Sequence, residues 1–306
     1  MWRDDSLCGE MKPAAFDYVA AKDVEHVLEL LSEYGEDAKL LAGGQTLGPM
    51  LNLRLLAPAV IVDINQVAEL GSYRLETKWV IGALTRQSTV EDDPLITTAQ
   101  PLVSEAIPLI ANRSIRNRGT VGGSLAHADP AAEWGALLLA LDGSIVLGRR
   151  GRPNRSVPAQ DFFYGMFETA IEDDELLLEV QIPTWREDYG WSFREVARRY
   201  GDFAVAGVAC RLARNSKGLL EDVRLGLFGI DERPLRALRT ESLLAGETVS
   251  DALLQSAAKE AASEIDPLSD LHGSAQYRRE LIELLVCQAL VEALRRCATP
   301  GGQYGE

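Results

Sequence analysis

A short glycine loop holds the first residues whose types point to chemistry. Two adjacent glycines follow the apolar pair Leu40-Leu41, and the loop consists of Ala42, Gly43, Gly44, Gln45, Thr46 and Leu47. Adjacent glycines allow a tight turn with positive φ, and because they lack a Cβ, a ligand can approach their N–H groups. Successive N–H groups that point one way form a nest for phosphate oxygens. A plain turn from a strand into a helix remains the alternative for this loop, since short glycine motifs often occur by chance.

A second glycine segment between residues 116 and 130 repeats this pattern. Its central residues are Gly119, Thr120, Val121, Gly122, Gly123 and Ser124. A helix is expected to begin at Pro130, and a helix N-terminus offers unpaired N–H donors and partial positive charge to an anion. Two glycine nests in one domain suit a pyrophosphate held from both sides. The spacing is not the fingerprint of a Rossmann fold, and no P-loop Gly-Lys-Ser/Thr follows either double glycine.

Short strands and helices are expected to position the two segments. The residue pattern predicts helices over 23–34 and 131–141, interrupted helical structure over 93–111, strands over 38–42, 59–64, 144–147 and 175–182, a hairpin over 73–82, and loops over 112–119 and 148–157. Asp129 is the expected N-cap of the helix over 131–141, and Pro130 is expected in its first turn.

The order of elements changes near Pro183. Strands over 205–213 and 223–230 are followed by helices over 234–244, 251–264 and 276–296. Strands followed by helices, without βαβ alternation, indicate an α+β domain. The main domain boundary is therefore expected near Pro183.

Charge and composition argue against several classes of function. The chain has 306 residues and a net charge of −15, and an acidic surface repels nucleic acid. No run approaches the ~20 apolar residues that span a bilayer, and the acidic N-terminus does not resemble a signal peptide, so a cytoplasmic protein without a membrane span is expected. The 4 cysteines and 3 histidines are scattered, which argues against a metal or iron–sulfur site on this chain.

The two glycine segments carry a family resemblance. AGGQTL at 42–47 and RNRGTVGGSLAHADPAAE at 116–133 are similar to the FAD-binding medium subunits of molybdenum hydroxylases. That family includes aerobic carbon monoxide dehydrogenase, nicotine and caffeine dehydrogenases, and the flavin domain of xanthine dehydrogenase. Further similar stretches are 11–18, 54–63 (RLLAPAVIVD) and 198–207 (RRYGDFAVAG).

The resemblance implies an α+β fold of two domains. A PCMH-type (vanillyl-alcohol-oxidase-like) FAD-binding domain is implied for 1–183, with α+β subdomains at about 11–70 and 71–183. The C-terminal domain over 184–306 is implied to be a small antiparallel sheet with helices. This division agrees with the boundary expected near Pro183.

The resemblance also implies roles for single residues. Residues 42–47 would hold the FAD pyrophosphate, and Thr120, Val121, Gly122, Gly123 and Ser124 would bind pyrophosphate and ribityl oxygens. Glu133 matches an acidic position that binds FAD, and Ile110 matches an apolar position that packs on it. For Asp129, a FAD contact and a helix N-cap remain equal alternatives.

One departure from the family pattern concerns a lysine near the flavin. The strand that aligns with it reads Phe193-Arg194-Glu195-Val196, so either Arg194 takes that role or the contact is lost. Arg113, Arg116 and Arg118 form a basic cluster that could contact FAD phosphates, a partner subunit or only solvent. His127 invites a covalent flavin link, but the resemblance is to members with non-covalent FAD.

The implied function is electron transfer within a larger enzyme. A molybdopterin large subunit would hydroxylate the substrate, and electrons would pass through a small subunit with 2Fe-2S clusters to FAD and then to an external acceptor. A dimer of heterotrimers is the implied assembly, and no residue of this chain is expected to be catalytic. The alternatives are a stand-alone FAD-dependent oxidase or reductase of the same fold and a scaffold that has lost its flavin.

Overall fold

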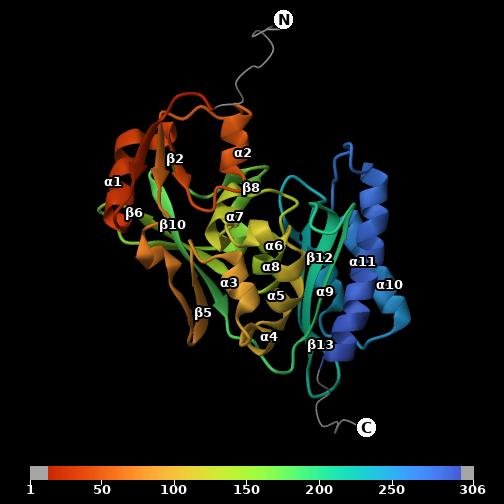
Figure 1. Cartoon of the computed structure of the whole chain (residues 1–306). Helices are drawn as coiled ribbons and strands as arrows, with labels where there is room; N and C mark the ends of the chain where they lie inside the picture. Colours follow the sequence, from red (N-terminus) through yellow and green to blue (C-terminus); the bar gives the residue numbers. More distant parts are fainter. Residues whose placement is uncertain (1–12, 298–306) are drawn as a thin grey trace, which may run out of the picture.

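Three main β-sheets and the helices packed on them build residues 13–297, which the computed structural model describes (Figure 1). The first sheet has the order β1-β3-β2, and both of its strand pairs are parallel. Its elements are β1 (Asp17–Ala20), α1 (Val24–Tyr34), η1 (Gly35–Asp37), β2 (Ala38–Leu41), α2 (Leu47–Asn52), β3 (Val60–Asp63) and η2 (Ala68–Gly71). Since parallel strands end at the same edge, the loops after β2 and β3 begin side by side, with Leu41 opposite Asp63.

The second sheet is antiparallel and has the order β4-β5-β10-β6-β7. Its strands are β4 (Tyr73–Leu75), β5 (Lys78–Gly82), β6 (Ser144–Arg149), β7 (Arg155–Pro158) and β10 (Glu175–Pro183), and a separate small hairpin is formed by β8 (Phe163–Gly165) and β9 (Glu168–Thr169). Short helices connect β5 to β6, namely α3 (Gln87–Asp92), α4 (Ile96–Ala99), α5 (Pro101–Ala106), η3 (Ile107–Leu109), α6 (Arg113–Arg116), α7 (Val121–His127) and α8 (Glu133–Ala140); η4 (Ala159–Asp161) follows β7.

The third sheet is antiparallel and has the order β11-β12-β13-β14. Its elements are β11 (Gly190–Ala197), β12 (Ala204–Arg214), β13 (Leu220–Phe228), β14 (Leu235–Arg236), α9 (Leu238–Leu244), α10 (Asp251–Ser263) and α11 (Ala275–Arg296). In Figure 1 this sheet stands between α5 and α8 on one side and α10 and α11 on the other. Because both faces are covered, ten of the eleven residues of β12 are buried.

Helix α8 joins the first part of the chain to this third sheet. All eight of its residues are buried, as expected for a helix that is apolar on every side after its first residue, Glu133. It packs against β13 so closely that a Cβ on Gly226 would lie 2.2 Å from the carbonyl oxygen of Ala136. The core around α8 includes Phe193 and Phe228 from the third sheet, so the two parts of the chain share one apolar core.

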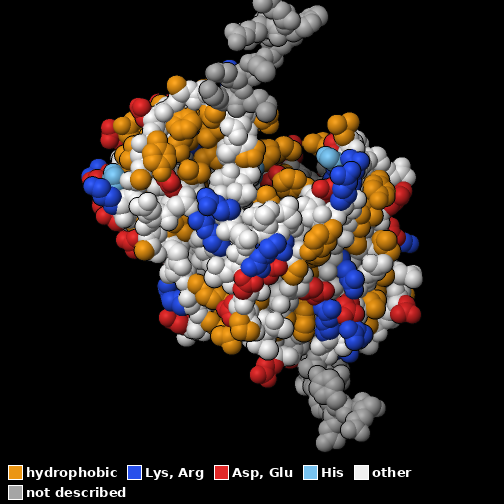
Figure 2. Space-filling view, in the orientation of Figure 1, with side chains coloured by type: hydrophobic (Ala, Val, Ile, Leu, Met, Phe, Trp, Pro, Cys, Tyr) orange, Lys and Arg blue, Asp and Glu red, His pale blue; other side chains and the backbone are white. Residues whose placement is uncertain are grey.

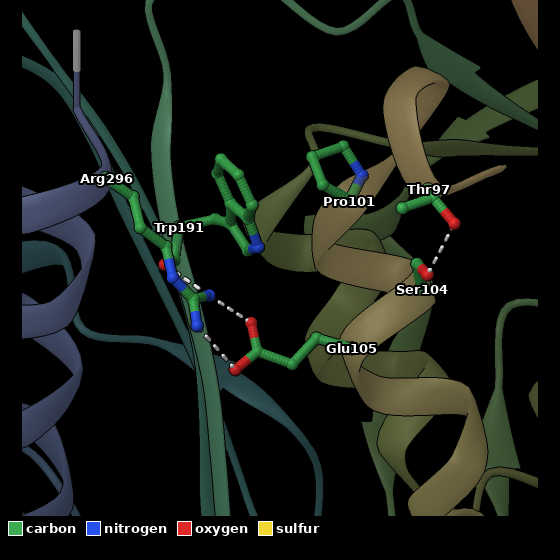
Figure 3. Close-up of a pocket in the computed structure, with 6 residues that line it drawn as sticks. All are labelled: Thr97, Pro101, Ser104, Glu105, Trp191 and Arg296. Atoms are coloured by element: carbon green, nitrogen blue, oxygen red, sulfur yellow. Dashed lines mark hydrogen bonds and ion pairs between the residues drawn. The ribbon is translucent and has the colours of Figure 1, made fainter. Parts of the chain in front are cut away.

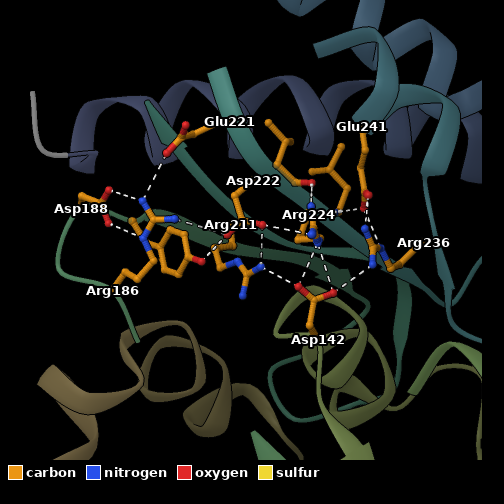
Figure 4. A network of polar contacts seen from close by, with 12 residues as sticks. Asp142, Arg186, Asp188, Arg211, Glu221, Asp222, Arg224, Arg236 and Glu241 are labelled. Carbon is orange, nitrogen blue, oxygen red and sulfur yellow. Dashed lines mark hydrogen bonds and ion pairs between the residues drawn. The ribbon is translucent and has the colours of Figure 1, made fainter. Parts of the chain in front are cut away.

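An ion-pair network reinforces this junction at the end of α8 (Figure 4). Asp142, two residues after the end of α8, pairs with Arg211 at 2.8 Å, Arg224 at 3.0 Å and Arg236 at 3.0 Å. Arg236 also pairs with Glu241, and Arg211 with Asp222. One carboxylate from the first part of the chain therefore forms ion pairs with arginines from three strands of the third sheet.

Some predicted elements are wrong in extent. Residues 112–119 contain helix α6, because the Asn112 side chain caps it by accepting from the N–H of Ile115. Half of the predicted loop over 148–157 is strand, since β6 and β7 pair as a hairpin. The predicted helix over 234–244 begins only at Leu238, because Leu235 and Arg236 pair with β13 as strand β14.

Candidate functional site

The first glycine loop leaves a row of backbone donors unused. Among residues 13–297, no group accepts a hydrogen bond from the N–H of Gly43, Gly44, Gln45 or Thr46. Gly44 has a φ of +69°, the left-handed region that favours glycine. The Gln45 side chain turns back to donate to the carbonyl of Gly43 at 3.0 Å. Consecutive unpaired N–H groups next to a left-handed residue are the geometry of an anion-binding nest.

The two glycine segments meet at Gly43. A Cβ on this residue would lie 2.4 Å from the carbonyl oxygen of Arg118 and 2.8 Å from the Cα of Gly119. At the same place Ala42 faces Gly123, whose Cβ would lie 3.9 Å from that of Ala42. Only a glycine at position 43 lets the segments touch, so the fold brings together residues that are about 75 positions apart in the chain.

Asn65 and Arg86 tie the two segments to each other. The Asn65 amide donates to the carbonyls of Ala42 at 2.8 Å and of Leu41 at 3.2 Å. Arg86 donates to the Asn65 side-chain oxygen at 2.6 Å and to the carbonyl of Arg118. The nest is therefore held by side chains from two further elements.

The second glycine segment has a different backbone geometry from the first. It forms the helix α7, and the N–H groups of Val121 and Gly122 donate to the carbonyls of Thr85 and Ala83, each at 3.0 Å. Thr120 caps the helix by accepting from the N–H of Gly123 at 3.0 Å, and Ser124 donates to the Thr120 carbonyl. The prediction of a second backbone nest is wrong, because the chain itself uses these donors. The hydroxyl of Ser124 has no hydrogen-bond partner among the described residues.

The predicted arginine cluster divides into paired and unpaired members. Arg116 is buried, pairs with Glu91 at 2.8 Å and donates to the carbonyls of Ile110 and Ala111. Arg113 pairs with Glu91 and Asp92. Arg118 is exposed, and no carboxylate within residues 13–297 forms an ion pair with it. Figure 2 shows the cations of this face in small separate groups, many of them beside acidic side chains.

The positive charge of Arg118 lowers the pKa of Asp63, which lies at the edge of the nest. Burial opposes the ionisation of Asp63, but hydrogen bonds from Tyr18 and Asn65 and the Arg118 charge lower the pKa of Asp63 overall. Asp63 ends β3, directly beside the first glycine loop. Because no carboxylate of the described residues pairs with Arg118, its guanidinium is available to pair with a phosphate bound at this loop.

A second group of predicted residues lies at the far end of α7. The helix ends at Ala128 in the left-handed conformation, and Asp129 accepts from the N–H of Ala131 at 2.9 Å. Asp129 is therefore not the N-cap of α8, which begins at Glu133 after Ala132; the predicted start at Ala131 is wrong because Asp129 forms a local turn instead.

Glu133 is buried in the first turn of α8. Burial raises the pKa of Glu133 to about 8, with added repulsion from Glu195 and Asp129. Burial also raises the pKa of Glu195, on β11, to about 7. His127 at the end of α7 stacks on Phe167, with ring centroids 4.8 Å apart, and burial lowers the pKa of this histidine.

Arg194 is not directed toward either group, and Ile110 packs in the same apolar core as Val121 and Leu125 of α7. Arg194 lies opposite Val208 on the face of β11 that packs on α11, whereas Phe193 and Glu195 face the first part of the chain. Neighbouring residues of a strand point to opposite faces, so Arg194 is directed away from the glycine segments. Ile110 is 6% exposed and packs within the apolar core.

A shallow pocket elsewhere joins the two parts of the chain (Figure 3). Glu105 of α5 pairs with Arg296 of α11, whose guanidinium lies 5.1 Å from the ring centre of Trp191. The pocket contains none of the predicted site residues. Its polar groups are already paired with one another, so it has the character of a domain junction.

Three residues of the site were missed by sequence reasoning, namely Asn65, Arg86 and Glu195. Asn65 could have been found, because it follows β3 and parallel neighbours β2 and β3 end at one edge. Arg86 and Glu195 have no local signal, since their positions depend on the packing of distant elements.

No group of His, Cys, Asp and Glu among residues 13–297 is arranged to hold a metal ion. Within the same residues, no helix has the length and apolar character that crossing a membrane requires.

Comparison with known families places both parts of the chain. Residues 14–185 match the FAD binding domain in molybdopterin dehydrogenase, and residues 191–293 match the CO dehydrogenase flavoprotein C-terminal domain. The chain is 40% identical to the 6-hydroxypseudooxynicotine dehydrogenase complex subunit alpha of Paenarthrobacter nicotinovorans, over 94% of this chain and 97% of that protein. It is 38% identical to the carbon monoxide dehydrogenase medium chain of Hydrogenophaga pseudoflava, over 94% and 100%.

Solved structures agree with these matches. Carbon monoxide dehydrogenase from Hydrogenophaga pseudoflava superposes with a TM-score of 0.90 at 38% identity, over 94% of this chain and 99% of that chain. Quinoline 2-oxidoreductase from Pseudomonas putida superposes with a TM-score of 0.86 at 33% identity, over 93% and 98%. The predicted α+β fold is confirmed. The chain belongs to the family of FAD-binding medium subunits of molybdenum hydroxylases, and it is a subunit of an oxidoreductase.

Proposed function

We propose that the chain holds FAD non-covalently and passes electrons from an iron–sulfur subunit through FAD to an external acceptor. The observation that carries the proposal is the row of unpaired N–H groups at 43–46, held against the second glycine segment. FAD, when bound, supplies the ability to take up and release electrons. The residues of this chain bind it, orient it and set its electrostatic surroundings.

The nest at 42–47 and the Arg118 guanidinium are proposed to hold the two phosphates. The hydroxyls of Thr46 and Ser124, which have no partner among the described residues, are proposed to donate to oxygens of the cofactor. Thr120, Val121, Gly122 and Gly123 shape the facing wall. Glu133 and Asp129 are proposed contacts at the other end of α7, because carboxylates accept well from sugar hydroxyls.

The assembly is proposed to be a dimer of heterotrimers, in which a small subunit carries 2Fe-2S clusters and a large subunit carries molybdopterin. Support comes from relatives that are medium chains or single subunits of dehydrogenase complexes. A stand-alone FAD oxidase or reductase would instead be active as a solitary protein.

We also propose a division into 1–183, with subdomains at about 11–70 and 71–183, and 184–306. The cytoplasmic location stays a prediction.

Changing Arg118 to glutamine is expected to weaken FAD binding by about 10-fold to 100-fold, since a hydrogen bond to a charged group contributes about 1.5–3 kcal/mol. Flavin fluorescence titration of the purified chain measures the dissociation constant. Arg113→Gln is the matched control, because Arg113 lies only five residues earlier in the chain but is already paired with Glu91 and Asp92. Equal affinities in both variants would remove Arg118 from the phosphate site.

A further inference from the structure

The two glycine segments are joined by hydrogen bonds only through the side chains of Asn65 and Arg86. Among residues 13–297, no hydrogen bond runs directly from residues 42–47 to residues 116–124. The backbone contact at Gly43 limits how closely the segments approach, but it contains no hydrogen bond that would fix their relative position. Any directional restraint between the segments therefore comes from Asn65 and Arg86.

Asn65 holds the start of the first glycine loop. Its side-chain amide donates to the carbonyls of Leu41 and Ala42, the residues directly before Gly43. Asp63 fixes the orientation of Asn65, because its carboxylate accepts from the backbone N–H of Asn65 at 2.9 Å and from the side-chain amide at 2.7 Å. The loop is therefore held at the point where its row of unpaired N–H groups begins.

Arg86 is fixed to the second segment by its own backbone. Its neighbours Thr85 and Gln87 both take part, since Val121 donates to the carbonyl of Thr85 and Gln87 donates to the carbonyl of Gly119, each at 3.0 Å. From this anchored position the Arg86 guanidinium donates to the carbonyl of Arg118 and to the Asn65 side-chain oxygen at 2.6 Å. A guanidinium is planar and presents its donors in a fixed fork, so it holds the two acceptors at one spacing.

This link keeps two cations close together. Within the described residues, neither Arg86 nor Arg118 forms an ion pair with a carboxylate. Burial and the neighbouring charge of Arg118 lower the pKa of Arg86. Like charges repel, so the hydrogen bonds through Arg86 keep Arg118 beside the loop against this repulsion, and an anion bound there relieves it.

The spacing between the segments matters for the kind of anion that fits. The unpaired N–H groups at 43–46 lie on the first segment, and the guanidinium of Arg118 belongs to the second. A single phosphate needs only one of these groups, whereas a diphosphate uses both at once. The second phosphate adds its full binding energy only where the spacing is set in advance, because otherwise part of that energy is spent on ordering the site.

We propose that Asn65 and Arg86 are positioning residues that make the site selective for a diphosphate over a monophosphate. The inference rests on the proposed FAD function and goes beyond it, since the two residues act through the loop and Arg118 and not by contact with the phosphates. The selectivity is a property of the link between the segments, and it is lost when either residue is removed.

The test measures how well ADP and AMP displace FAD from the full-length chain and from the variants Asn65→Ala, Arg86→Gln and the double variant. The unchanged chain is expected to prefer ADP over AMP by about 10-fold or more, since a hydrogen bond to a charged group contributes about 1.5–3 kcal/mol. In each single variant the affinities for FAD and ADP are expected to fall by about 10-fold, while that for AMP stays within about twofold. The double variant is expected to lose no more than a single one, because both changes remove the same link. Arg150→Gln, in an exposed pair with Glu25 and Glu29, is the control and should behave as the unchanged chain.

The variant Arg86→Lys separates the link from the charge. Lysine keeps the positive charge but has no planar fork of donors, so it is expected to lose the preference for ADP as Arg86→Gln does. A lysine variant that kept the preference would show that Arg86 acts by its charge, and the inference would be overturned.

Three further results would overturn the inference while leaving the FAD function intact. They are equal displacement of FAD by ADP and AMP in the unchanged chain, equal loss of ADP and AMP affinity in the single variants, and additive losses in the double variant. The second of these is the result of a general structural defect. An unchanged chain that binds neither FAD nor ADP would instead refute the proposed function.

Discussion

Replacing Gly43 with alanine is expected to abolish FAD binding, with a loss of affinity of at least about 100-fold, or about 2.8 kcal/mol. The added Cβ would lie 2.4 Å from the carbonyl oxygen of Arg118, and this neighbour is backbone that cannot rotate away. The two glycine segments must therefore separate, which misplaces the unpaired N–H groups of the loop. Overpacking of this kind also destabilises a fold by about 1–3 kcal/mol.

Gly48→Ala is the matched control for this variant. Gly48 lies five residues further along, in α2, and a Cβ there would meet nothing within 4 Å. Alanine in a helix is more favourable than glycine by about 0.5–1 kcal/mol, so unchanged or raised stability and normal FAD binding are expected. Fluorescence titration with FAD and thermal unfolding followed by circular dichroism measure the two effects. A folded Gly43→Ala protein with normal affinity would show that the contact between the segments does not form the site.

Changing Asp142 to asparagine is expected to lower the free energy of unfolding by about 1–3 kcal/mol, less than for a fully buried ion pair, because the Asp142 side chain is 32% exposed and Arg211 and Arg236 keep Asp222 and Glu241 as partners. Arg211 and Arg236 have side chains that are 5% and 9% exposed, and each would lose a negative partner. Asparagine keeps the size of the side chain and tolerates the left-handed φ of +50° at this position. The effect therefore reports the lost charge.

Asp92→Asn serves as the comparison in urea unfolding of the same chain. Asp92 also pairs with an arginine, but its side chain is 61% exposed and that of Arg113 is 46% exposed. Exposed pairs contribute about 0–1 kcal/mol, so little change is expected. If the two variants unfolded at the same urea concentration, the network around Asp142 would not hold the third sheet to α8.

The first glycine loop could be predicted from the sequence because a turn depends on local residues. Two glycines after an apolar strand are enough to indicate it, and the structure gives Gly44 the expected positive φ. The second segment looked like a copy of the first but is not one. Its N–H groups donate to Thr85, Ala83 and Thr120. Thr85 and Ala83 lie more than 30 residues before the motif, so no local sequence pattern predicts these bonds.

The placement of Arg194 shows a second limit of sequence reasoning. Both faces of β11 are covered, so the alternation of residues along the strand does not reveal which face meets which neighbour. A predicted flavin contact that is wrong by one position along the strand therefore falls on the opposite face of the sheet. Glu195, not Arg194, therefore faces the first part of the chain, and the structure was needed to show it.

The central claim is that one FAD lies non-covalently against the loop 42–47. The most direct test is the FAD content of the purified full-length chain, measured by absorbance before and after acid precipitation and after addition of excess FAD. We predict about one FAD per chain, all of it released into the acid supernatant. A colourless protein that takes up no added FAD would contradict the claim, and flavin that stayed with the precipitate would contradict non-covalent binding.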